Sequence, residues 1–131
     1  LQCDFSYMLS PEMFGEFVKP ELAASCRRLS RAFYHLDGKG ELPHLKHLCD
    51  IPELAGIQWI PGAGMPPAAE WPDVLKEITA SGKKLQVFVG CLDEVEKILS
   101  YIETPESVAF LGAIQQQDEE RLMDILKRYD A

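Results

Sequence analysis

The sequence predicts an α/β fold of parallel βα repeats, and three observations support this class. Short apolar runs recur about every 22–29 residues, the length of one strand plus one crossover helix. A stretch with helical periodicity follows each run. The runs are nearly continuous in apolar residues, as is typical of a parallel sheet covered by helices. We expect the four strands near 32–36, 57–60, 85–89 and 107–111.

The size and composition of the chain fit one globular domain over residues 1–131. Hydrophobic residues make up 47% of the chain and charged residues 26%, which is enough to bury a core. The formal net charge of −8 argues against nucleic acid and membranes as partners. No apolar run approaches the ~20 residues of a membrane span, and no signal peptide opens the chain. We therefore expect a cytoplasmic protein.

The first part of the chain contains a capped helix and the first strand. Residues 1–9 fit a short strand or a strand-end loop. Ser10-Pro11-Glu12 is typical of a helix start, because Ser caps the first turn and Pro is favoured at the first helical position. Pro20 should kink or restart this helix. The first strand ends in Asp37-Gly38-Lys39-Gly40, a turn-forming stretch.

The other helices follow the strands at regular intervals. We expect them at about 41–49, 69–81, 92–102 and 118–129. The segment 61–67 between the second strand and its helix is too rich in Gly and Pro for regular structure. Because loops at the carboxyl ends of parallel strands often carry binding residues, this loop, with Met65 in it, is a candidate rim for a substrate pocket.

His35 and Asp37 are the leading catalytic candidates. They are two residues apart in a strand, so both side chains point to the same face at its carboxyl end. An imidazole and a carboxylate together can bind a metal or share a proton. Cys91, at the end of the third strand, could also ligate the metal or react as a thiolate. The alternatives are a His35–Asp37 hydrogen bond that caps the strand end and an inert buried thiol at Cys91.

Four further residues are weaker candidates. Trp59, near a strand end, could support a ring-shaped ligand, although core packing is the commoner role of Trp. Asp4 lies among apolar neighbours and is either a pocket carboxylate that contacts substrate or a solvated end residue. His44 and His47 share a helix face, but the sequence offers no complete ligand set with them, so we interpret them as residues of a surface helix. All four cysteines are expected to be free thiols, because they form no CxxC pair.

Several segments resemble the carboxyl-terminal half of the uroporphyrinogen decarboxylase superfamily. The resemblance extends over nearly the whole chain and rests mainly on L-S-P-E-M-F at 9–14, F-V-K-P at 17–20, Y-H-L-D-G at 34–38 and G-I-Q-W at 56–59. It implies half of a TIM-like (β/α)8 barrel, with the other strands supplied by an amino-terminal half. The chain begins at Leu1 rather than at a methionine, and we expect it to be a piece of a longer protein.

The resemblance also implies a chemistry. Members of the superfamily transfer methyl groups between a corrinoid and a thiol through a zinc site, or decarboxylate a porphyrinogen in tetrapyrrole biosynthesis. Where the zinc-dependent relatives carry a His-x-Cys pair, this chain has His35 and Asp37, and its last strand is not followed by the second Cys. His35, Asp37 and Cys91 could hold a harder divalent metal than a thiolate-rich site would.

We therefore expect the catalytic half of a corrinoid-linked methyltransferase, whose partner is a small-molecule substrate or a corrinoid protein. Porphyrinogen decarboxylation, a lyase reaction, is the alternative, but its substrate carries several carboxylates and Lys39 is one of few basic residues near a strand end. A third possibility is a non-catalytic fragment that binds or dimerises. Unpaired strand edges and an apolar inner face favour a homodimer.

Overall fold

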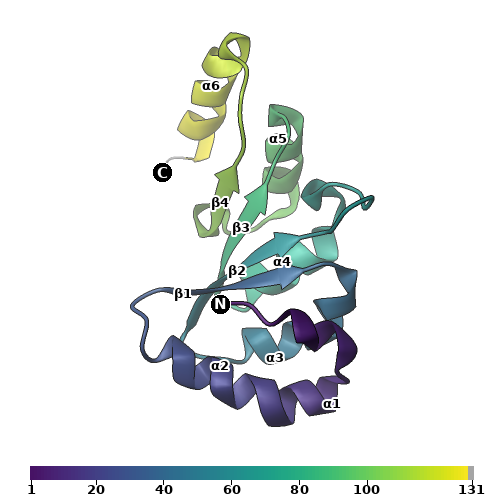
Figure 1. The fold of residues 1–131 in the computed structure, drawn as a ribbon. Helices are drawn as coiled ribbons and strands as arrows, with labels where there is room; N and C mark the ends of the chain where they lie inside the picture. The colour runs from purple at the N-terminus through teal and green to yellow at the C-terminus, as the bar shows by residue number, and fades with distance from the viewer. Residues whose placement is uncertain (130–131) are drawn as a thin grey trace.

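The structure is a computed structural model that describes residues 1–129. Its centre is a sheet of four parallel strands in the order β1-β2-β3-β4 (Figure 1). The strands are β1 (Ala32–Asp37), β2 (Leu54–Ile60), β3 (Lys84–Phe88) and β4 (Val108–Leu111). The predicted α/β class and the parallel pairing are confirmed, and β2 begins earlier in the chain than the pattern predicted.

Helices alternate with the strands along the chain. They are α1 (Pro11–Met13), α2 (Lys19–Cys26), α3 (Leu45–Cys49), α4 (Pro72–Ala80), α5 (Leu92–Tyr101) and α6 (Glu119–Tyr129). Short 3₁₀ turns join several of them, including Asp4–Met8 ahead of α1 and Lys39–His44 between β1 and α3. Within residues 1–129, no helix combines the length and the apolar character needed to cross a membrane.

Helices cover one face of the sheet. Because side chains alternate along a strand, every second residue points to that face, and these residues are at most 1% exposed: Tyr34, Leu36, Ile57, Trp59, Leu85 and Val87. They form one core with residues of the helices that follow β1, β2 and β3: Leu45, Leu48, Leu75, Ile78 and Ile98. Leu22 and Cys26 of α2 belong to the same cluster, so the core of the molecule lies between the sheet and α2, α3, α4 and α5.

The opposite face of the sheet, here called the open face, carries polar side chains and exposed Phe88. His35, Gln58 and Gln86 lie on it and are only half-buried, and Phe88 is 53% exposed. The sequence pattern suggested a sheet covered by helices, and this expectation is met on one face only. The apolar runs hid the difference, because the first three contain one strongly polar residue each, His35, Gln58 and Gln86, and the fourth contains none.

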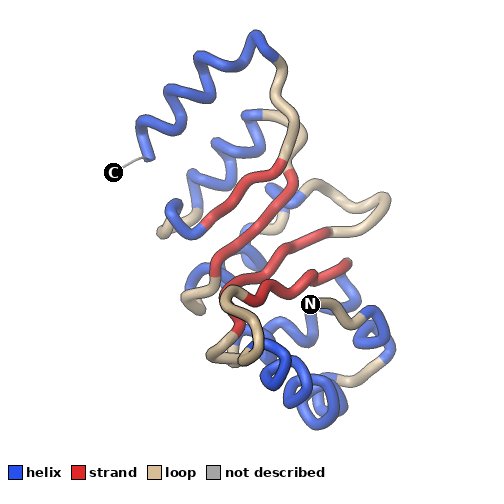
Figure 2. The backbone as a smooth tube through the Cα atoms, turned by 60° about the vertical axis from the view of Figure 1, so that its left-hand side comes forward, coloured by secondary structure: helices blue, strands red, loops and turns tan. Residues whose placement is uncertain are grey.

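The two ends of the sheet are packed differently. Helices α5 and α6 lie side by side near β4, whereas α1 and α2 lie at the other end near β1 (Figure 2). Ile125 of α6 is buried in a small second cluster with Leu92, Val95 and Leu99 of α5. Arg121 of α6 pairs with carboxylates of α5 at the exposed rim of this contact.

The amino-terminal segment runs along the free edge of β1. The amine of Leu1 donates to the carbonyl oxygen of Phe33 (2.6 Å), and the N–H of His35 donates to the carbonyl oxygen of Leu1 (2.8 Å). This is the hydrogen-bond pattern of a parallel neighbour. The expectation of a strand end at residues 1–9 therefore holds at Leu1, and a 3₁₀ turn follows it.

The helix after this segment starts as predicted and restarts at Pro20. The N–H of Met13 donates to Ser10 Oγ (3.2 Å), which confirms the Ser10 cap. A π-helical turn at Phe14–Val18 precedes Pro20, and the chain continues directly into α2. This wider turn interrupts the α-helical hydrogen bonds, and α2 begins at Lys19 with Pro20 in its first turn, so the restart expected at Pro20 is confirmed.

Candidate functional site

A hollow of about 630 Å³ lies at the carboxyl ends of β1, β2 and β3. Its walls include Asp37 from β1, Trp59 from β2, Met65 from the loop 61–67 and Glu94 from α5. The structure thus brings together three residues that the sequence suggested as site residues. Glu94 Oε2 accepts a hydrogen bond from the N–H of Gly90 (2.8 Å), which fixes the turn between β3 and α5.

Trp59 reaches this hollow from the covered side of the sheet. It is fully buried and shares its face with Ile57, so it points away from His35. Its ring meets Trp71 edge-on, with centroids 5.4 Å apart. His35 and Trp59 therefore cannot line one pocket, because His35 pairs with Gln58, the residue before Trp59, and neighbouring residues of a strand point to opposite faces.

His35 lies on the open face, at the β1 end of a row of polar side chains that continues with Gln58 on β2 and Gln86 on β3. Its Nδ1 is 2.5 Å from Oε1 of Gln58, the residue directly opposite it on β2. Gln58 Nε2 in turn donates to Oε1 of Gln86 (2.9 Å), the residue opposite on β3. A row of in-register hydrogen bonds therefore crosses three strands.

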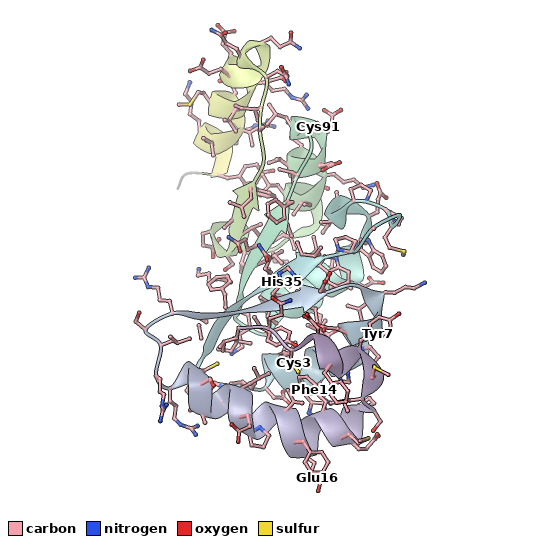
Figure 3. The ribbon with its side chains drawn as sticks, viewed as in Figure 1. Cys3, Tyr7, Phe14, Glu16, His35 and Cys91 are labelled. Carbon is pink, nitrogen blue, oxygen red and sulfur yellow. The ribbon has the colours of Figure 1, made fainter. Side chains whose placement is uncertain are left out.

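The predicted metal ligands do not converge. Cys91 lies near the start of α5, well away from His35 (Figure 3). Within the described part of the chain, no three His, Cys, Asp or Glu side chains are grouped so that they could hold a metal ion. Asp4 is exposed and accepts a hydrogen bond from Gln2 (2.5 Å). The residues present therefore do not fit the expected site of His35, Asp37 and Cys91.

The four cysteines are free thiols, as predicted. Burial raises the pKa of Cys26 and Cys49, so both remain protonated near neutral pH and are poor nucleophiles. Cys91 is exposed rather than buried, against the alternative of an inert core thiol.

A buried carboxyl group supports the end of β1. Glu41, which is 2% exposed, accepts from the hydroxyl of Ser6 (2.8 Å) and from the N–H of Asp37 (3.1 Å). Burial raises the pKa of Glu41, and the carboxylates of Asp37 and Asp4 act in the same direction, although the two hydrogen bonds oppose them. Glu41 therefore joins the turn Asp4–Met8 to the backbone of a candidate site residue.

His44 is a core residue, and its interpretation as part of a surface helix is wrong. It is fully buried, stacks on Phe14 with ring centroids 4.3 Å apart, and has Nε2 2.7 Å from the carbonyl oxygen of Ser6. Because a carbonyl oxygen only accepts, Nε2 carries the proton. His47 is half-buried beside Gly15.

Sequence reasoning missed Gln58, Gln86 and Glu41. A usable signal existed for the glutamines, because each is the one polar residue inside an apolar run, Gln58 in 56–60 and Gln86 in 85–89. The register then places Gln58 opposite His35 and Gln86 opposite Gln58. Glu41 gave no such signal, since its partner Ser6 is distant in the sequence.

The arrangement offers a proton acceptor on the open face and a carboxylate at the edge of an apolar hollow. Comparison with protein-family models, with curated proteins and with solved structures finds no match for this chain. The described walls of the hollow include two carboxylates, of Asp37 and Glu94, and no basic side chain. Such a site favours neutral or cationic groups over polyanions.

Proposed function

We infer that the chain is the carboxyl-terminal half of a (β/α)8 barrel of the uroporphyrinogen decarboxylase superfamily. The sequential strand order with one helix-covered face is the arrangement of a barrel segment, and the open face would become part of the interior. The backbone pairing of Leu1 with β1 supports a further parallel strand on that edge, contributed by the amino-terminal half.

Within this barrel, the chain would supply one side of the active site of a corrinoid-linked methyltransferase. The observation that carries the proposal is the hydrogen-bonded row His35–Gln58–Gln86 on the open face. When a methyl group is transferred to a thiol, the thiol must lose its proton, and His35 Nε2 is the base that the row presents. Asp37 and Met65 would contact the substrate at the neighbouring hollow.

The charge of the hollow separates methyl transfer from porphyrinogen decarboxylation. A porphyrinogen carries several carboxylates, which require cationic partners. The described walls contribute carboxylates instead, so methyl transfer is the better-supported proposal. The candidate ligands His35, Asp37 and Cys91 do not converge in the described part of the chain. The proposed reaction therefore uses no metal held by this half.

The test is a methyl-transfer assay on the protein that contains both halves, with a methylated corrinoid as donor and a thiol as acceptor. Replacing His35 by Gln should lower the rate by about 10²–10⁴-fold, the usual contribution of a general base. His47→Gln, a half-buried histidine away from the open face, is the matched control and should leave the rate unchanged. Absence of transfer, or equal rates for both variants, would overturn the proposal.

A further inference from the structure

The orientation of Gln58 determines which nitrogen of His35 carries the proton. A glutamine amide has one accepting oxygen and one donating nitrogen. Gln58 uses its nitrogen to donate to Gln86 Oε1 (2.9 Å). Its oxygen, the atom that faces His35 at 2.5 Å, can only accept, so Nδ1 of His35 must be the donor.

The consequence is a defined state of the imidazole. With the proton on Nδ1, Nε2 of neutral His35 has a free lone pair and can take a proton or bind an electrophile. A hydrogen bond to one ring nitrogen also fixes the ring orientation, as it does for histidines that serve as ligands or bases. The half-buried setting of the row strengthens the bond relative to water.

We propose that Gln58 is a positioning residue for His35, which holds the imidazole in its Nδ1–H form and leaves Nε2 as the reactive nitrogen on the open face. Gln86 fixes the direction of the Gln58 amide. The reverse arrangement, in which Gln58 donates to Nδ1, would place the proton on Nε2 and leave no free base there. The importance of Nε2 for reaction rests on the proposed function, but the proton position does not.

The test is a nitrogen NMR spectrum of the imidazole rings in the whole chain, recorded at a pH where the histidines are neutral. The chain has three histidines, and the His35 signals are identified by their loss in His35→Gln. We expect Nδ1 of His35 to be protonated and Nε2 to be unprotonated. His44 provides an internal reference of opposite type, because its Nε2 donates to the Ser6 carbonyl oxygen.

Variants of Gln58 separate positioning from simple packing. Gln58→Glu retains an accepting oxygen and should keep the proton on Nδ1. Gln58→Leu removes the acceptor, so the His35 signals should shift toward the Nε2–H form, while the His44 signals stay in place. Gln86→Leu should produce a smaller shift in the same direction, because it frees the Gln58 amide to turn.

A wild-type spectrum with the His35 proton on Nε2 overturns the proposal, and this measurement needs no variant that might fail to fold. Equal His35 spectra in Gln58→Leu and wild type overturn it as well. If the proton is on Nδ1 but methyl transfer is absent, the positioning role stands and the proposed function fails.

Discussion

At the scale of single residues, the buried carboxyl group of Glu41 couples folding to pH. Its pKa is raised mainly by burial, so the folded chain holds this proton to a higher pH than the unfolded chain does. A group of this kind makes the free energy of unfolding fall as the pH rises from the unfolded pKa through the folded one. Glu12, Glu53 and Glu96 have lowered pKa values and act in the opposite direction.

We expect Glu41→Gln to remove the Glu41 contribution. The amide cannot ionise and can still accept from the N–H of Asp37 while donating to Ser6. The difference in the free energy of unfolding, variant minus wild type, should therefore increase as the pH rises from about 4.5 to 8. Urea unfolding of both proteins across this range measures the difference. Glu16→Gln, at an exposed position, is the control, and parallel pH profiles for Glu41→Gln and wild type would contradict the expectation.

The predictions for single residues succeed where the spacing within one strand decides which face of the sheet a side chain points to. His35 and Asp37 share a face because they are two residues apart, and this spacing is visible in the sequence. The faces of Trp59 and His35 differ because of the register between β1 and β2, which a single sequence does not display. The burial of His44 depends on Phe14 and Ser6, and these contacts form only when the chain folds back on β1.

At the scale of elements, the sheet depends on a close approach of three strands at Gly56. A methyl group there would meet the ring of Phe33 on β1 and would lie 2.6 Å from the backbone carbonyl oxygen of Lys84 on β3. The carbonyl oxygen belongs to the sheet and cannot rotate away. Gly40 makes a comparable approach to the ring of Tyr7, but Tyr7 is 60% exposed and can turn into solvent.

Gly56→Ala should therefore destabilise the protein by about 1–3 kcal/mol, as is usual for overpacking, and Gly40→Ala should cost clearly less. Urea unfolding monitored by circular dichroism compares the two variants with the wild type. Equal losses of stability would show that neighbouring strands move apart at Gly56 more easily than the structure indicates.

The order of strands and helices was predictable because it depends on local patterns. Apolar runs, the Ser10 cap and the Gly- and Pro-rich loop at 61–67 are all local signals, and the elements lie where these signals predict them. The π-helical turn before Pro20 was not predictable, because such a turn has no simple sequence signature. Nor did the apolar runs reveal that helices cover only one face.

At the scale of the whole molecule, the open face and the free edge of β4 favour self-association. Phe88 is 53% exposed at the carboxyl end of β3, and the outer edge of β4 has no strand beside it in the described sheet. An unpaired strand edge favours pairing with another chain, and Phe88 adds an exposed apolar side chain on the neighbouring strand. Leu1 occupies the edge of β1, so the free edge of β4 and the open face beside Phe88 are the surfaces left for a second copy.

We expect the isolated chain to form a two-fold dimer at micromolar concentration. Replacing Phe88 by Asp should shift the equilibrium toward the monomer, whereas Leu29→Asp, at a 50% exposed position after α2, should leave it unchanged. Sedimentation velocity over a concentration series measures both. A wild-type chain that stays monomeric would contradict this prediction.

The strand order also limits how a ligand can be enclosed. In parallel sheets whose order reverses, loops on either side of the reversal diverge and leave a crevice at this topological switch point. The order β1-β2-β3-β4 contains no reversal, so the four strands create no crevice of that kind. A ligand in the hollow beside Asp37 would contact the carboxyl ends of β1, β2 and β3 and the loop 61–67. The surface that closes over it must come from outside this sheet, and affinity should therefore rise when that surface is added.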